Sequence, residues 1–291
     1  MAAQTVLHYR YEFQPDEVAE IVACNAEHGF AIVKGMLPLG MVEMLKAEVR
    51  RVLEPTVKEK DAITHTHINF IEYSPAYASL MSYEPYMRIA HALYDGEPIR
   101  VNRSAAIYKR PGCGPMAWHT DWAPRTHHPY GVDSVLNTSG ASSMWFYLNG
   151  IDSVRGGLAI IPDSHTEDWP APEGFAFTAN RKSFSRIGGE LRSHTRMDDV
   201  PGAMPVLTDP GDMIIFAERT YHGVYPHRGT ETRLSCGMSF CEKSYVPEQV
   251  WELPESAKQF IAFCPPETKK YVDGYVGINR EWRSTPPDAT V

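Results

Sequence analysis

Cysteine is scarce in this sequence and never occurs at the spacing of a metal-binding pair. Only 5 of the 291 residues are cysteine, and no two of them form a CxxC motif. The odd number argues against a disulfide scaffold, and the spacing argues against a structural zinc site. We therefore expect reduced thiols and a cytoplasmic location.

Long hydrophobic runs and an excess of basic residues are also missing. No apolar stretch reaches the ~20 residues that a membrane-spanning helix needs, and residues 1–13 contain no apolar signal core. Residues 288–291 carry neither a peroxisomal nor an endoplasmic-reticulum address. A net charge of −8 at pH 7 argues against a general nucleic-acid surface. We therefore expect a protein with no membrane partner and no nucleic-acid partner.

The apolar content, in contrast, is sufficient for one large core, since 43% of the residues are hydrophobic. Helical periodicity predicts helices over residues 15–28, 39–53 and 84–94, with a short apolar strand at 30–33. We predict a single domain over residues 1–291 with three parts: a helical buttress (1–97), a jelly-roll core (98–244) and a C-terminal helical segment (245–291).

The region after residue 98 has the pattern of a β-protein. Short apolar stretches alternate with turns that are rich in glycine and proline. The pattern predicts strands at residues 99–109, 118–122, 143–148, 158–161, 213–221 and 233–240. Strands at this spacing favour an antiparallel sandwich or barrel.

Four segments have other interpretations. Residues 61–77 are irregular and aromatic, which predicts a surface loop packed by its own rings. Residues 123–142 are polar and long enough to act as a lid over a site, and residues 169–205 form a second polar insertion. Residues 245–275 are predicted to be helical and to close the domain.

The chemistry centres on His119-Thr120-Asp121 and on a histidine a hundred residues later, His222. Side chains at i and i+2 of a strand point to the same face, so His119 and Asp121 would project together. If folding brings His222 beside them, two imidazoles and one carboxylate share a face. Such a face leaves about three positions of an octahedral metal open, which suits non-haem Fe(II) oxygenases.

Five ordered motifs resemble the phytanoyl-CoA hydroxylase-like family of Fe(II)/2-oxoglutarate dioxygenases. Their order and spacing together are much more specific than any one of them. The motifs are His119-Thr120-Asp121, Trp145-Phe146-Tyr147-Leu148, the GGLAIIPDSH stretch at 156–165, the DPGDMIIF stretch at 209–216, and His222 with Arg233 eleven residues later.

The resemblance implies a mostly β fold with flanking helices, a double-stranded β-helix of the jelly-roll or cupin-like type. It implies that His119, Asp121 and His222 bind Fe(II), that Arg233 binds the distal carboxylate of 2-oxoglutarate, and that Trp145 lies near this cosubstrate. A planar guanidinium suits a carboxylate independently of the resemblance. The implied activity uses Fe(II), 2-oxoglutarate and O2 to oxidise a C–H bond of a small molecule, with release of succinate and CO2.

The sequence departs from the family pattern at two informative positions. Asp163 replaces the usual glycine of the PGSH motif, so that turn is expected to differ. Val224 stands where several members carry a serine that contacts the cosubstrate carboxylate. A second donor must then assist Arg233, and Tyr108 and Lys109 are the two candidates.

Other polar and aromatic residues have weaker functional readings. Trp122, Arg125, His127 and His128 would contact substrate if residues 123–142 fold over the metal, and would otherwise be core or solvated side chains. His227 is the competitor of His222 as a ligand, disfavoured by its place in a turn only six residues before Arg233. A zinc-type hydrolase or isomerase and a non-catalytic cupin-like binding module are the alternatives. Arg233 argues against the hydrolase, because hydrolysis does not require a residue that binds a cosubstrate carboxylate.

Overall fold

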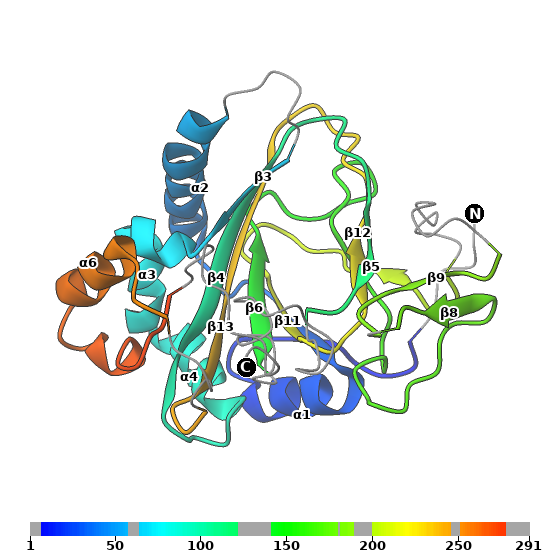
Figure 1. Ribbon diagram of the computed structural model, residues 1–291, viewed down its shortest axis with the longest axis horizontal. Helices are drawn as coiled ribbons and strands as arrows, with labels where there is room; N and C mark the ends of the chain where they lie inside the picture. Colours follow the sequence, from blue (N-terminus) through cyan, green and yellow to red (C-terminus); the bar gives the residue numbers. More distant parts are fainter. Residues whose placement is uncertain are drawn as a thin grey trace, which may run out of the picture.

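The computed structural model describes residues 7–57, 64–121, 141–179, 181–188, 200–245 and 251–277. Two β-sheets face each other, and helices α2, α3, α4 and α6 cover the outer side of the larger sheet (Figure 1). Strands β5 and β12 of the smaller sheet lie on the opposite side of the molecule from these helices (Figure 1). This arrangement confirms the predicted fold class of a β-rich jelly roll with flanking helices.

The larger sheet has seven strands, and the smaller sheet facing it has four. All described strand pairs are antiparallel except β1 with β2. The large sheet runs in the order β1 (Glu12–Phe13), β2 (Phe30–Val33), β11 (Met213–Ala217), β6 (Ser142–Tyr147), β13 (Arg233–Glu242), β4 (Ile99–Lys109) and β3 (Thr64–Ile68). The small sheet runs β10 (Met204–Pro205), β7 (Leu158–Ile160), β12 (His222–Val224) and β5 (Met116–His119), and a separate hairpin pairs β8 (Phe175–Phe177) with β9 (Phe184–Arg186).

The helices form because their apolar residues recur on one face, which packs against the large sheet. In α2 the buried residues are Val42, Leu45, Val49 and Leu53, which follow the three- and four-residue spacing of a helical stripe. The described α-helices are α1 (Val18–His28), α2 (Leu39–Leu53), α3 (Pro75–Ala78), α4 (Glu84–Ala92) and α6 (Glu255–Phe263), and the 3-10 turns are η1 (Glu54–Thr56), η2 (Phe70–Tyr73), η3 (Ser79–Ser82) and η6 (Lys269–Tyr271).

The two faces of the large sheet differ in chemistry. On β13, Leu234, Cys236 and Met238 belong to the core that the helices cover. Because successive side chains point to opposite faces, the residues between them, such as Ser235 and Gly237, face the small sheet. The helix-side face is therefore a continuous apolar surface, while the inner face of β13 carries small and polar residues. This difference leaves room for a polar site between the sheets.

Several sequence predictions agree closely with the structure. The helix predicted at 39–53 and the strands predicted at 30–33 and 99–109 have the same bounds as α2, β2 and β4. The residues predicted as a helical buttress also contribute β1, β2 and β3 to the large sheet. The division of the chain into one domain of three parts stays a prediction.

Two predictions about connecting segments, the loop at 61–77 and the helix at 245–275, were wrong. Residues 64–77 contain β3, η2 and most of α3. The polar insertion predicted at 169–205 carries the β8–β9 hairpin and β10 in its described residues. The helix predicted over 245–275 is reduced to α6 and η6, since Pro254 precedes α6 and Pro265 and Pro266 follow it, and proline interrupts helical hydrogen bonding.

The strand predicted at 213–221 ends early, at Ala217, and the next strand along the chain belongs to the other sheet. β11 ends at Ala217, and Thr220 N–H closes a turn by donating to the Ala217 carbonyl at 2.9 Å. β12 then starts at His222 in the small sheet. The turn carries the chain from one sheet to the other and so brings His222 to the inner side.

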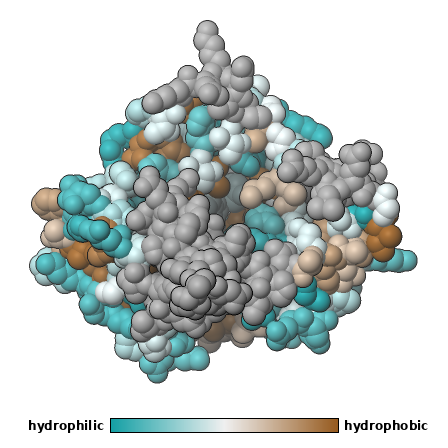
Figure 2. All heavy atoms as spheres, viewed as in Figure 1, coloured by the Kyte–Doolittle hydropathy of each residue, from teal (hydrophilic) through white to brown (hydrophobic). Residues whose placement is uncertain are grey.

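The described surface residues mix hydrophobic and hydrophilic side chains. Hydrophobic residues reach the surface of the face in Figure 2 as separate patches among hydrophilic ones. The most exposed large hydrophobic residues, Phe263, Leu39 and Ile187, come from separate parts of the chain. In the described part of the chain, every helix is too short or too polar to cross a membrane.

Candidate metal centre

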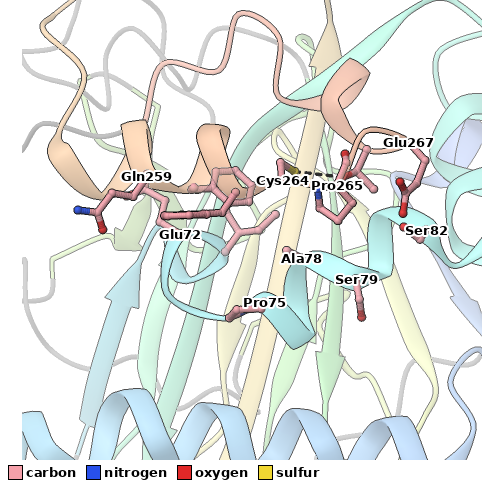
Figure 3. Close-up of a pocket in the computed structure, with 13 residues that line it drawn as sticks. Glu72, Pro75, Ala78, Ser79, Ser82, Gln259, Cys264, Pro265 and Glu267 are labelled. Carbon is pink, nitrogen blue, oxygen red and sulfur yellow. Dashed lines mark hydrogen bonds between the residues drawn. The ribbon is translucent and has the colours of Figure 1, made fainter.

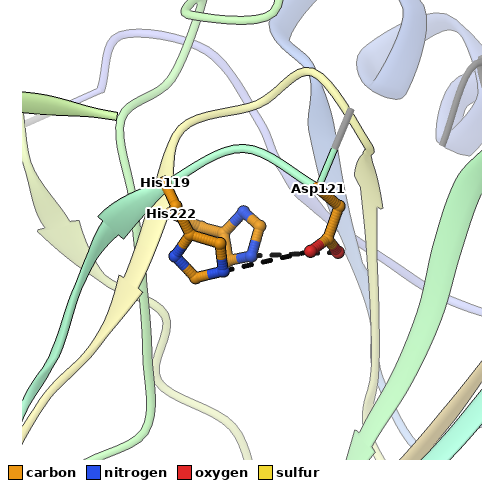
Figure 4. A group of neighbouring side chains, drawn as sticks. All are labelled: His119, Asp121 and His222. Atoms are coloured by element: carbon orange, nitrogen blue, oxygen red, sulfur yellow. Dashed lines mark ion pairs between the residues drawn. The ribbon is translucent and has the colours of Figure 1, made fainter. Parts of the chain in front are cut away.

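The side chains of His119, Asp121 and His222 meet between the two sheets (Figure 4). His119 and His222 are directly opposed partners of β5 and β12, and their ring centroids lie 4.3 Å apart. Nε2 of His119 lies 3.9 Å from Oδ1 of Asp121, and Nε2 of His222 lies 4.0 Å from Oδ2. An ion about 2.1 Å from each ligand atom would separate these atoms by about 3 to 4 Å. The three residues therefore fit a metal ion.

The two histidines are held in the same tautomer by the backbone. Nδ1 of His119 donates to the Ala117 carbonyl at 2.9 Å, and Nδ1 of His222 donates to the Thr220 carbonyl at 2.9 Å. A carbonyl can only accept, so each Nδ1 carries the proton and each Nε2 keeps its lone pair. Both lone pairs are therefore available on the side that faces Asp121, as metal coordination requires.

Asp121 does not lie in a strand, although the sequence predicted strand through residue 122. β5 ends at His119, and the next backbone N–H, that of Thr120, donates to the Lys182 carbonyl beside the β8–β9 hairpin at 2.8 Å. Asp121 follows in a bend. The strand argument from i to i+2 was therefore wrong in its geometry, although the two side chains do lie together.

The electrostatics of the cluster favour the protonation states that bind metal. Burial, and then His222, lowers the pKa of His119 to about 4. Burial raises the pKa of Asp121, but His222, Arg103 and His119 together lower it more, to about 2. Near neutral pH the imidazole of His119 is neutral and the carboxyl of Asp121 is ionised. These are the forms that coordinate a divalent cation.

Arg233 and Lys109 lie directly opposite each other, at the start of β13 and the end of β4. Only 3% and 6% of their surfaces are exposed. Nη1 of Arg233 donates to the Arg155 carbonyl at 2.7 Å, and the guanidinium stands over the Tyr147 ring. Burial lowers the pKa of both cations, and Arg233 lowers that of Lys109 further. Among the described residues neither cation has a carboxylate partner, so the pair is suited to an anionic ligand.

The structure separates the two candidates for the donor that assists Arg233. Lys109 shares the inner face with Arg233, because residues opposed across a ladder point to the same side. Tyr108 points to the other side, into the core under the helices, and its hydroxyl is directed to Glu54 at 3.5 Å. Tyr108 therefore does not share a face with Arg233, whereas Lys109 does, and the cosubstrate roles of both residues stay predictions.

Trp145 lies on the inner face of β6 and packs against the core between the sheets. Its ladder partner is Gly237 on β13. A Cβ atom at Gly237 would lie 2.0 Å from Cε3 of Trp145, so the indole occupies the space that a side chain would need. Glycine at 237 is thus what allows Trp145 to lie flat on the sheet. Its proximity to 2-oxoglutarate stays a prediction.

His227, the competitor of His222 as a ligand, has a structural partner. Nε2 of His227 donates to the Glu231 carbonyl at 2.6 Å, and His227 is not part of the cluster. Trp122, Arg125, His127 and His128 lie outside the described residues, as does nearly all of the lid predicted at 123–142. Their substrate roles stay predictions.

Sequence reasoning gave no role to Arg103 and Glu218, which the structure places at the centre. Nη2 of Arg103 lies 3.6 Å from Oδ2 of Asp121. Glu218 is 1% exposed, and neither carboxylate oxygen has a hydrogen-bond partner among the described residues. Burial is the main cause that raises the pKa of Glu218 to about 7, with Arg103 acting to lower it and Asp121 to raise it. From the sequence, Arg103 could have been recognised only as a charged residue at an inward-facing position of the strand predicted at 99–109.

A separate cavity of about 400 Å³ lies in the helical layer (Figure 3). It is formed between α6 and the segment from η2 to η3, and its lining includes Ile71, Ala78 and Phe260. These three residues belong to the core on the outer side of the large sheet. The cavity is therefore separate from the metal centre, and none of the predicted site residues line it.

Comparisons with known proteins agree with this geometry. The family model described as Phytanoyl-CoA dioxygenase (PhyH) matches residues 26–235, a region that includes the metal cluster and Arg233. A relative from Stutzerimonas stutzeri, a probable alpha-ketoglutarate-dependent hypophosphite dioxygenase, is 26% identical over 161 residues. That alignment covers 54% of this chain and 49% of the relative, so the chain spans about half of the relative's length.

Solved structures show the same fold at low sequence identity. The epimerase SnoN in complex with Fe3+, alpha ketoglutarate and nogalamycin RO has a TM-score of 0.59 and 20% identity, over 83% of this chain and 91% of SnoN. HygX from Streptomyces hygroscopicus with nickel, 2-oxoglutarate and hygromycin B bound has a TM-score of 0.59 and 16% identity, over 80% of this chain and 90% of HygX.

Proposed function

Because the chain belongs to the phytanoyl-CoA dioxygenase (PhyH) family, we propose that it is an Fe(II)- and 2-oxoglutarate-dependent dioxygenase that oxidises a C–H bond of a small molecule. The family match covers the metal cluster and the buried cations, which are the two parts of the site that such an enzyme needs. When bound, Fe(II) with 2-oxoglutarate and O2 supplies the oxidising power, and the cosubstrate leaves as succinate and CO2.

The chain's own residues supply the metal ligands. Nε2 of His119, Nε2 of His222 and one carboxylate oxygen of Asp121 would hold Fe(II). The backbone acceptors at Ala117 and Thr220 keep both imidazoles in the coordinating tautomer. Three protein ligands leave positions for the cosubstrate, which is the requirement of this enzyme class.

The opposed cations Arg233 and Lys109 are the observation that favours a dioxygenase over a zinc-type hydrolase. A zinc-type hydrolase built on two histidines and an aspartate has no use for two buried cations, whereas a dicarboxylate cosubstrate is stabilised by them. Arg233 and Lys109 would bind the distal carboxylate together, and this replaces the donor lost at Val224. The buried pair would also exclude water from that end of the cosubstrate.

The substrate is proposed only at the level of a small molecule. The names of the relatives include hypophosphite, nogalamycin RO and hygromycin B, an inorganic anion and two natural products. Loops above a conserved scaffold set specificity in such folds, so the class of reaction transfers between relatives more readily than the substrate.

The test is succinate formation that depends on both Fe(II) and 2-oxoglutarate. We expect the wild-type protein to release succinate slowly alone and faster when metabolite extracts supply its substrate, together with a product 16 mass units heavier. His119→Ala should abolish the metal-dependent release. His91→Gln, on α4 and hydrogen-bonded to Tyr271, is the matched control and should keep it. Full succinate release by His119→Ala would refute the metal assignment.

A further inference from the structure

The carboxylate of Asp121 is the least anchored of the three proposed ligands. The two histidines lie on paired strands, and backbone carbonyls fix both rings. Asp121 lies beyond the end of β5 in a bend, so the β-ladder does not fix its side chain. Another group must therefore orient this carboxylate if it is to face the two Nε2 atoms.

Arg103 is placed to provide that orientation. It lies on β4 opposite Ser239 of β13, on the same inner face as Lys109 and Arg233. Its Nη2 lies 3.6 Å from Oδ2 of Asp121, and 19% of the Arg103 side chain and 27% of the Asp121 side chain are exposed. The backbone of Arg103 is paired in the β4–β13 ladder, next to an irregularity between Ser239 and Phe240, so the ladder fixes where the side chain starts.

A second carboxyl group lies near the same guanidinium. Glu218 is within electrostatic range of Arg103 as well. Nη2 of Arg103 lies at ion-pair distance from Asp121, while both oxygens of Glu218 lack hydrogen-bond partners among the described residues. The guanidinium is thus directed to the metal ligand rather than to the other carboxyl group.

We propose that Arg103 is a positioning residue that holds the carboxylate of Asp121 in the orientation required to bind the metal ion. The inference rests on the proposed function, because it assumes that Asp121 is a ligand. Partners that orient metal ligands are worth about 10- to 100-fold in metal affinity. A positive charge beside the site also repels a cation, so loss of Arg103 would tighten metal binding if repulsion were its main effect. Weaker metal binding after loss of Arg103 would therefore indicate positioning of Asp121, and tighter binding would indicate charge repulsion.

The experiment titrates the apoprotein with Mn(II) and measures free Mn(II) by electron paramagnetic resonance. We expect Arg103→Met to weaken Mn(II) binding about 10- to 100-fold. Arg103→Lys keeps the charge without the planar fork, and should also weaken binding. The matched control is Lys258→Met, on α6 at the outer side of the large sheet, and it should change the affinity by less than about threefold. Thermal melting of each apoprotein verifies folding.

A double-mutant cycle tests whether Arg103 acts through Asp121. In an Asp121→Asn background, we expect Arg103→Met to change Mn(II) affinity by less than about twofold, because the carboxylate that it orients is gone. Mn(II) binding to Arg103→Met as tight as that to the wild type, or tighter, would overturn the inference while leaving the metal site in place. Failure of the wild type to bind Mn(II) would instead overturn the proposed function and this inference with it.

Discussion

Lys109 and Arg233 face each other across the β4–β13 ladder as two buried cations without a carboxylate partner in the described structure. Like charges at opposed positions of a ladder are destabilising, and burial adds the cost of desolvation. Such a pair lowers the stability of the protein alone. It is explained if a dicarboxylate ligand neutralises it.

This relationship predicts opposite effects on binding and on stability. Lys109→Met should weaken 2-oxoglutarate binding by about 1–3 kcal/mol, and Arg233→Met by about 3–5 kcal/mol, because a buried carboxylate loses a charged partner. Without ligand, Lys109→Met should instead raise the free energy of unfolding by about 1–3 kcal/mol. Calorimetric titration and urea unfolding measure the two quantities. Lys46→Met, at a lysine of α2 that pairs with Glu43, should change neither the 2-oxoglutarate affinity nor the free energy of unfolding. Unchanged cosubstrate affinity in both inner-face variants would assign the clamp to other residues.

Glu218 predicts a specific dependence of stability on pH. Its pKa rises from an ordinary value of 4.5 to about 7 on folding, because the carboxyl is buried. The folded protein therefore holds this proton more tightly, and the contribution of Glu218 to stability falls as the pH rises from 4.5 to 7. The total loss is about 3 kcal/mol above pH 7. Glu218→Gln should then be more stable than the wild type at pH 8 by up to that amount, with little difference at pH 4.5. Equal unfolding curves at pH 8 would show that the carboxyl is not buried as an unpaired group.

Asp163 predicts that the turn of the PDSH motif tolerates glycine better than alanine. Asp163 has a φ of 63°, the left-handed region that glycine adopts most easily. Its carboxylate also accepts from Nδ1 of His28 at 2.7 Å. Asp163→Ala should lower the free energy of unfolding by about 1–2 kcal/mol, because alanine is also strained at a positive φ and cannot accept the hydrogen bond from His28. Asp163→Gly should lower it by less than about 1 kcal/mol. A larger loss with glycine than with alanine would contradict this account.

The close approach of Trp145 to Gly237 predicts a rescue. Gly237→Ala should displace the indole, because the new Cβ would lie 2.0 Å from Cε3. We expect a loss of about 1–3 kcal/mol in stability from overpacking, together with a shift in tryptophan fluorescence. Adding Trp145→Phe should restore most of the stability. If Gly237→Ala alone is as stable as the wild type, the contact is not as close as described.

Local patterns in the sequence predicted the elements that depend only on neighbouring residues. The apolar stripe of α2 and the alternation of β4 are repeated within each segment, so their bounds could be read directly. Prediction failed where the partner was distant. The edge strand β3 is polar and aromatic, and it is a strand only because it pairs with β4. The turn after Ala217 was not recognised, because residues 218–220 contain neither the glycine nor the proline that usually marks a turn.

The sequence by itself determined which residues are chemically suited to the metal centre, since His119, Asp121, His222 and Arg233 occur in a family order that needs no coordinates. Only the tertiary structure decided between Lys109 and Tyr108, because one step along a strand reverses the direction of the side chain and the register of β13 fixes which side faces the site. It also brought Arg103 and Glu218 to Asp121, residues that are remote or unremarked in the sequence. Such contacts depend on the pairing of distant strands, which local periodicity does not encode.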